Sequence, residues 1–331
     1  MISAQQAELL WDKLGELGTS SKRSKFDVAN VAYYFGALIV MSALGWLMNL
    51  GWEKFGGLGI FLLATCYAVL FALAGRTLWY KENLKIPGGL LFTLAVWMTP
   101  LAIYGFERVT GIWPQDAPDN FQGYHIWVKG TWFLMEIGTI LAGLIALKFI
   151  RFPFLTFPIA FSLWYMSMDL TPLLFGKSRF TWQQSLRVSL LFGLIILLFA
   201  YFIDRRTRED YAFWGYLFGL MAFWGGLSLM ESGSEWKKFL YCLINVGLVF
   251  LAVFLQRRVF VVFGACGVLG YLGHLSYNVF KDSFLFPMVL TFLGLAVIFL
   301  GVQYQRHSDR FEQAVLAVFP VTLRRLRPVE R

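Results

Sequence analysis

The chain has 331 residues, of which 58% are hydrophobic and only 15% are charged, and its formal net charge is +9. A soluble domain carries roughly 25% charged and 45–50% apolar residues, so this composition excludes a soluble globule and predicts a protein of the lipid bilayer. The basic residues lie mainly between long apolar runs, which argues against a nucleic-acid partner.

Residues 1–27 precede the first long apolar run and are predicted to form a cytoplasmic amphipathic segment, with Leu10, Leu14 and Leu17 on one face. A transmembrane helix bundle is predicted over 28–303. Residues 304–331 are predicted to form a basic amphipathic tail in the cytoplasm, and a solvated tail is the alternative. At the membrane surface both segments would contact anionic lipid headgroups.

The long apolar runs are the strongest signal, because a membrane-spanning helix needs about 20 mostly apolar residues. The candidate spans are 28–51, 57–80, 86–106, 127–148, 152–175, 184–203, 211–230, 237–256, 259–280 and 284–303. Residues 107–125 are predicted to be a long loop between two of them. The predicted fold class is therefore all-α, a polytopic transmembrane helix bundle of about ten spans.

The distribution of basic residues predicts the orientation. An even number of spans places both termini on one side of the membrane. If that side is the cytoplasm, the inner segments contain most of the 29 Lys and Arg residues, as the positive-inside rule requires. We therefore expect both termini to be cytoplasmic.

One predicted span, 259–280, has glycine at every third position from Gly264 to Gly273. Small residues let transmembrane helices approach closely. This spacing predicts a tightly packed helix.

Polar side chains within the predicted spans are the candidate functional residues, because an ionisable group at the bilayer centre costs roughly 2.5–3.5 kcal/mol and usually has a partner or a function. The candidate substrate-binding residues are Glu136, Asp169, Tyr241, Asn245, His274 and Asn278. We expect them to line a polar pocket open to the outer side. Glu136 would be the protonatable centre, and Asp169 and His274 would be its partners. The alternative is that these groups hydrogen-bond between helices and lock them together.

Several other kinds of chemistry lack support. The three cysteines fall within predicted spans and form no CxxC motif, and the predicted bundle contains one histidine. No phosphate-binding glycine motif opens a helix after a strand. We therefore assign no catalytic residue, no metal site and no cofactor.

Four blocks of the sequence resemble a group of uncharacterised bacterial polytopic inner-membrane proteins. The opening ISAQQAELLWDKLGEL is followed by YYFGALIVMSALGWLMNLGWEKFG, in which Asn49 and Trp52 match an Asn/Trp pair at the end of that group's first span. LWYMSMDLTPLLFG and FGACGVLGYLGHLSYNVFKDS resemble later segments. The resemblance implies bacterial origin and a multi-pass protein of the inner (plasma) membrane. It implies no activity.

Three functions are compatible with this pattern. The first is a transporter or binding protein for a small solute or proton, with the outer pocket as its site. The second is a non-catalytic scaffold or assembly partner of another membrane protein. The third is an intramembrane enzyme that acts on a lipid or lipid-linked sugar.

Overall fold

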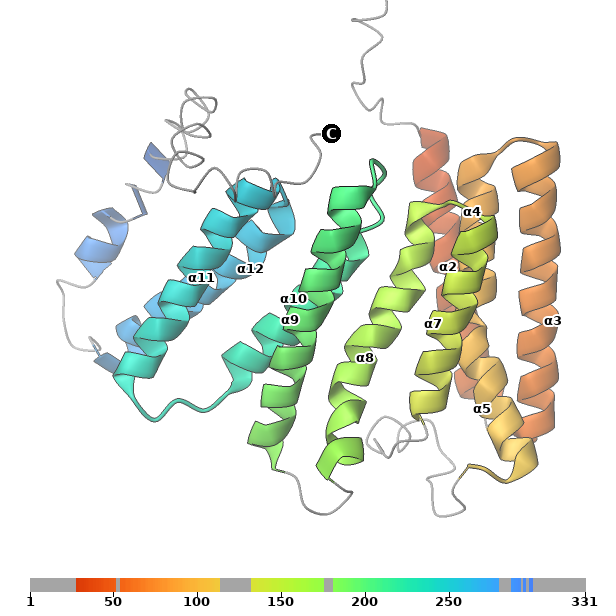
Figure 1. Ribbon diagram of the computed structural model, residues 1–331, viewed down its shortest axis with the longest axis horizontal. Coiled ribbons are helices and arrows are strands. Elements are labelled where there is room, and N and C mark those ends of the chain that lie inside the picture. Colours follow the sequence, from red (N-terminus) through yellow and green to blue (C-terminus); the bar gives the residue numbers. More distant parts are fainter. Residues whose placement is uncertain are drawn as a thin grey trace, which may run out of the picture.

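The computed structural model describes residues 28–51, 54–113, 132–175, 181–279, 287–292, 294–295 and 298–299. The predicted terminal segments, 1–27 and 304–331, lie outside these residues. Over the described residues the chain is helical and has no strand (Figure 1). The all-α prediction is therefore confirmed for this part of the chain.

The helices stand next to one another and run alternately up and down, except that α4 and α5 follow one another in the same direction (Figure 1). They are α2 (Val28–Gly51), α3 (Gly56–Arg76), α4 (Lys85–Trp97), α5 (Thr99–Thr110), α7 (Trp132–Phe149), α8 (Thr156–Phe175), α9 (Trp182–Arg206), α10 (Phe213–Leu229), α11 (Glu235–Leu255) and α12 (Arg258–His274). A π-helical turn follows α3 at Thr77–Lys81, another follows α12 at Leu275–Val279, and a 3-10 turn at Pro153–Leu155 precedes α8.

Seven helical stretches of the described chain are long and apolar enough to cross a membrane. They are Val28–Trp46, Gly56–Lys81, Lys85–Thr110, Trp132–Phe149, Trp182–Arg206, Glu235–Leu255 and Arg258–Tyr277. Each coincides with a predicted span. The predicted spans 152–175 and 211–230 correspond to α8 and to the shorter apolar helix α10. The tenth, 284–303, is only partly described, so the number of spans stays a prediction.

The stretch predicted as one span over 86–106 consists of two helices, α4 and α5, which meet at Met98. Pro100 lies in the first turn of α5 and has no N–H to donate to the carbonyl of Val96, which explains a break at this point. Helix α5 continues to Thr110. Glu107, predicted to begin the outer loop, is therefore helical and buried.

Glycines set the closest helix contacts. A Cβ added at Gly226 on α10 would lie 2.6 Å from the carbonyl oxygen of Leu186 on α9, and one at Gly264 on α12 would lie 2.6 Å from the carbonyl oxygen of Asn245 on α11. The predicted close packing of α12 is found at Gly264 and Gly267. It is not found at Gly270 or Gly273, where a Cβ would meet no atom within 4 Å.

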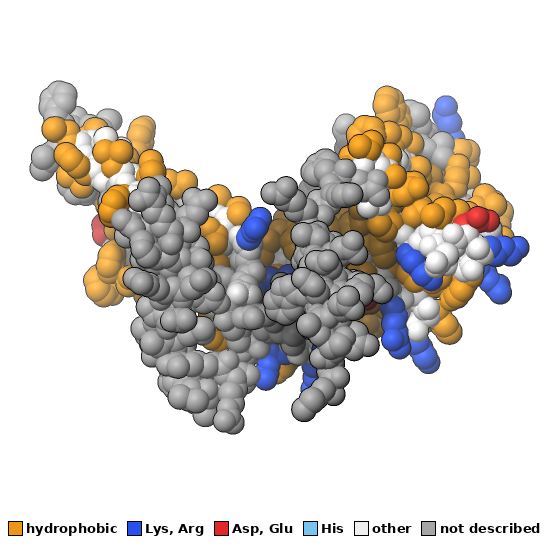
Figure 2. Space-filling model, turned by 90° about the horizontal axis from the view of Figure 1, so that it is seen from above, with side chains coloured by type: hydrophobic (Ala, Val, Ile, Leu, Met, Phe, Trp, Pro, Cys, Tyr) orange, Lys and Arg blue, Asp and Glu red, His pale blue; other side chains and the backbone are white. Residues whose placement is uncertain are grey.

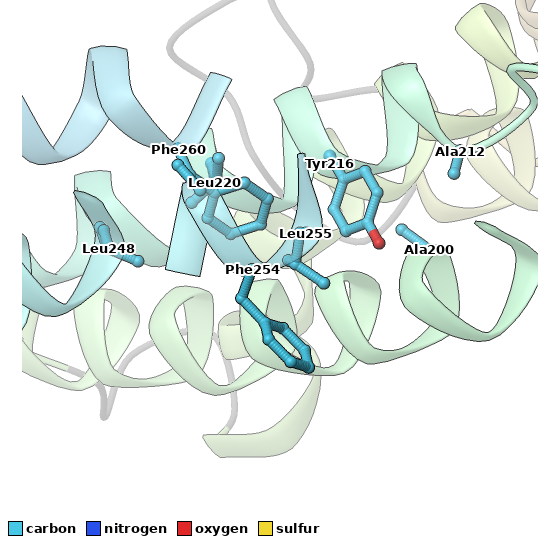
Figure 3. Packing of buried hydrophobic residues seen from close by; sticks show 9 residues of the cluster. Ala200, Ala212, Tyr216, Leu220, Leu248, Phe254, Leu255 and Phe260 are labelled. Carbon is cyan, nitrogen blue, oxygen red and sulfur yellow. The ribbon is translucent and has the colours of Figure 1, made fainter. Parts of the chain in front are cut away.

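A core cluster joins the α9–α10 and α11–α12 hairpins (Figure 3). Within it the Tyr216 hydroxyl donates a 3.2 Å hydrogen bond to Asp204 Oδ2. Arg257, in the turn between α11 and α12, donates from Nε to the same oxygen at 3.1 Å and from Nη1 to Asp210 at 2.8 Å. The two hairpins are therefore held by apolar packing and by a largely buried charge cluster.

One end of the bundle is markedly basic. There α3, α7, α9 and α11 end and α4, α8, α10 and α12 begin. The basic residues in these turns are Arg76, Lys81, Lys85, Lys148, Arg151, Arg205, Arg206, Arg208, Arg257 and Arg258. Figure 2 looks down on the molecule of Figure 1 and shows several Lys and Arg side chains. The asymmetry agrees with the positive-inside rule, and the orientation of the termini stays a prediction.

Candidate functional site

The α7–α8 hairpin places Glu136 and Asp169 at the same level. The helices are antiparallel neighbours joined by residues 150–155. Each acidic residue lies about 16 residues from the middle of this connection, so at 1.5 Å per residue both reach the same depth. The two carboxyl groups are close enough to interact electrostatically. They are 5% and 2% exposed, so the pair is almost completely buried.

The carboxyl pair has no basic partner among the described residues, where no Lys, Arg or His lies within ion-pair distance of it. Both oxygens of Glu136 and Oδ2 of Asp169 receive no hydrogen bond in the described part of the chain. Two adjacent carboxylates cannot both stay ionised in an apolar interior. The arrangement therefore suits one proton held between them, or a cation bound to them.

Neighbouring hydroxyl groups do not compensate for this lack of donors. The Thr139 hydroxyl donates to the carbonyl of Met135 at 2.7 Å, and Ser167 donates to the carbonyl of Trp164 at 2.6 Å. Tyr165, one turn before Asp169, is within electrostatic range of both carboxyl groups. Its phenol therefore lies near the pair.

Glu136 also lines a cavity of about 180 Å³ between α7, α8 and the break between α4 and α5. The other lining residues are Trp97, Pro100, Trp132, Met135, Thr139, Phe161, Ser162 and Tyr165. The rings of Trp132 and Tyr165 stack with centroids 6.2 Å apart, and those of Trp97 and Phe161 lie 5.0 Å apart. Pockets for drug-sized ligands measure about 300–1,000 Å³, so this one suits a smaller solute or a few water molecules.

The lining chemistry favours a cation. Aromatic ring faces attract positive charge, and Glu136 supplies a carboxyl group in the same wall. A small organic cation would find both features within one cavity.

Asn245 and Tyr241 belong to a different cluster, on α10, α11 and α12. Asn245 is fully buried; it accepts a 3.0 Å hydrogen bond from Trp224 Nε1 and donates one of 2.8 Å to the carbonyl of Tyr241. The Tyr241 hydroxyl lies 2.9 Å from Ser228 Oγ. Gly267 makes room for the Asn245 amide. These contacts fit the alternative prediction, that polar groups lock the helices together.

His274 contacts the beginning of α11. Its Nε2 is 3.1 Å from Glu235 Oε2 and 3.1 Å from Lys238 Nζ. In Figure 1, α9 and α10 lie between this helix pair and the α7–α8 hairpin. Of the six predicted residues, the structure thus brings together Glu136 and Asp169 and places His274, Tyr241 and Asn245 elsewhere. Asn278 is in the π-helical turn after α12, and its side chain lies outside the described residues.

Glu107 is a buried acid that was not among the residues predicted from the sequence. It is 1% exposed, and both of its carboxyl oxygens receive no hydrogen bond within the described chain. Tyr104, three residues earlier on the same face of α5, is 2% exposed. The three-residue spacing of Tyr104 and Glu107 is typical of one helix face and could have indicated a buried acid. It was overlooked because Glu107 was assigned to the predicted loop.

Comparisons with protein-family models, with curated proteins and with solved structures found no match to this chain. The resemblance to bacterial inner-membrane proteins therefore stays a prediction.

Proposed function

We propose that this chain is an integral membrane transporter or binding protein for a small cationic solute, and that the Glu136–Asp169 pair takes up and releases a proton as the solute binds. One observation carries the proposal. A buried pair of carboxyl groups, without a basic partner among the described residues, opens through Glu136 onto an aromatic cavity. Ionisable groups within membrane helices are costly and usually functional.

The position of the pair supports access from outside. Glu136 lies about 7 Å from the middle of α7 and Asp169 about 5 Å from the middle of α8, both toward the end opposite the basic turns. If the basic end faces the cytoplasm of a bacterium, the cavity belongs to the outer half of the inner membrane. This location is part of the proposal.

A membrane scaffold is the second candidate. Asn245 and Tyr241 form hydrogen bonds within and between helices. These bonds favour a rigid bundle. In a scaffold the carboxyl pair would hold α7 and α8 together and would have no solute to bind.

Proton uptake can be tested without knowing the solute. The full chain would be reconstituted in lipid, and infrared difference spectra would be recorded across a pH step. We expect a carboxylic-acid C=O band that is lost in Glu136→Gln and in Asp169→Asn. The matched control is Glu231→Gln, which changes an exposed acid at the same end of the bundle. A band that persists unchanged in both site variants would contradict the proposal.

Flux provides the second measurement. Proteoliposomes containing a pH-sensitive dye would be given a potassium diffusion potential, with and without tetramethylammonium as the probe cation. We expect the wild type and Glu231→Gln to move protons in a cation-dependent manner and Glu136→Gln to be inactive. If Glu136→Gln is folded and equally active, the transport proposal fails. If it is inactive only because it unfolds, the scaffold becomes the favoured function.

A further inference from the structure

A second cavity lies on the side of the bundle, away from the carboxyl pair. We name it the α3–α7 groove. It has a volume of about 680 Å³ and is lined by α3, α4, α5 and α7. At the basic end it adjoins a pocket of about 930 Å³, and the two share Ala72, Phe92, Phe149 and Ile150. Together they form a continuous path from the apolar helix faces to the charged turn after α3.

Small side chains give this groove its depth. Ala68 and Ala72 on α3 face Ala142 and Ala146 on α7 across it. Small residues in membrane helices usually permit a neighbouring helix to pack closely. Here α4 and α5 pack between α3 and α7 and form the floor. The space above this floor is lined mostly by apolar side chains, which suits a hydrocarbon chain.

The groove and the adjoining pocket are together longer than the hydrocarbon part of one lipid leaflet is thick. From Phe61 in the lining of the groove to Arg76 in the lining of the adjoining pocket, α3 rises about 22 Å. Half of a bilayer's hydrocarbon core is about 15 Å thick. An acyl chain whose headgroup lies at the level of Arg76 would therefore remain within the groove over its whole depth in the leaflet.

The adjoining pocket at the basic end forms the mouth of the groove, and it contains basic and hydroxyl side chains. Arg76 and Lys81 line it together with Thr77 and Tyr80. Both basic residues are exposed, and neither forms an ion pair with any residue that the structure describes. Glu82 follows Lys81 in the chain but does not line the pocket. A phosphate group would complement this charge.

We propose that the α3–α7 groove is a binding site for one anionic phospholipid. An acyl chain lies along the small residues of α3 and α7, and the headgroup phosphate lies between Arg76 and Lys81. The site is independent of the Glu136–Asp169 cavity, so either proposal can fail without the other.

Native mass spectrometry of the full chain in detergent tests the proposal. The protein would be titrated with phosphatidylglycerol or with phosphatidylcholine of the same acyl chains. Each basic residue near an anionic headgroup contributes about 1 kcal/mol, so Arg76→Gln with Lys81→Gln should weaken phosphatidylglycerol binding roughly 30-fold and leave phosphatidylcholine binding nearly unchanged. The control pair, Arg206→Gln with Arg258→Gln, removes the same charge from exposed positions at the same end and should have little effect.

Two further measurements test whether the lipid occupies the groove itself. Ala72→Leu narrows the groove where its two parts join and should weaken binding of both lipids. Inorganic phosphate should not displace phosphatidylglycerol. The proposal is overturned if the Arg76/Lys81 pair behaves like the control pair, if phosphate alone competes, or if folded Ala72→Leu binds lipid normally. It is also overturned if Ala72→Leu converts a dimer to a monomer, since a second copy of the chain would then occupy the groove.

Discussion

Asp204 and Asp210 bind the same guanidinium group from different environments, and this difference predicts their contributions to stability. Asp204 is 1% exposed and Asp210 is 46% exposed, while Arg257 is 12% exposed. Removing one partner of a buried ion pair costs about 3–5 kcal/mol, whereas an exposed pair contributes about 0–1 kcal/mol. Because Asp210 would still partner Arg257, we expect Asp204→Asn to lower the free energy of unfolding by about 3 kcal/mol. Asp210→Asn should lower it by less than about 1 kcal/mol.

The assay is reversible unfolding in mixed micelles by added SDS, followed by far-UV circular dichroism. Asparagine can still accept the hydrogen bond from Tyr216, so the variant tests the charge rather than this contact. Combining Asp204→Asn with Arg257→Gln should cost much less than the sum of the single changes, because the double variant leaves no buried charge unpaired. Equal effects of Asp204→Asn and Asp210→Asn, or strict additivity with Arg257→Gln, would refute this reasoning.

Three other substitutions, together with Gly270→Ala as a control, test the packing and the buried polar groups by thermal unfolding in detergent. Gly267→Ala should lower the melting temperature, because the new methyl group overlaps the Asn245 amide and overpacking costs about 1–3 kcal/mol. Gly270→Ala should leave the melting temperature unchanged, since a Cβ there meets no atom within 4 Å. Trp224→Phe leaves Asn245 Oδ1 without its donor and should cost about 1–3 kcal/mol; a neutral result would mean that another donor replaces it. Glu107→Met should raise the melting temperature, because it removes two buried oxygens that receive no hydrogen bond from the described residues; a lower melting temperature would indicate that the carboxyl group has a stabilising partner.

Hydropathy predicts where apolar helices lie along this chain, because the bilayer fixes the length of apolar sequence that a span requires. The seven long apolar stretches all coincide with predicted spans. What hydropathy does not predict is a break within an apolar run. Met98 lies inside such a run, and only Pro100 indicates that two helices meet there. The same uncertainty hid Glu107, because an acid near the end of a run resembles a loop residue.

For the polar residues, the depth in the membrane is easier to predict than the lateral position, which is the choice of neighbouring helices. The helical rise of about 1.5 Å per residue sets the depth of Glu136 or His274 within its own helix. Which other helix faces that residue depends on how the hairpins pack against one another, and hydropathy carries no information on this. Residues of similar depth were therefore predicted to share one pocket, whereas the structure pairs His274 with Glu235.

Short connections supply the missing lateral information for neighbours in the chain. Helices joined by a few residues pack against each other, so residues equally distant from the turn lie at the same level and meet where both face the partner helix. This rule places Glu136 opposite Asp169 across the turn at residues 150–155 and Asn245 opposite Gly267 across the turn at Gln256 and Arg257. In the structure Glu136 and Asp169 interact electrostatically, and Gly267 packs against the Asn245 amide. It makes no prediction for His274 and Asp169, which belong to different hairpins. Levels within a hairpin therefore follow from counting residues along the sequence, whereas contacts between hairpins require the packed structure.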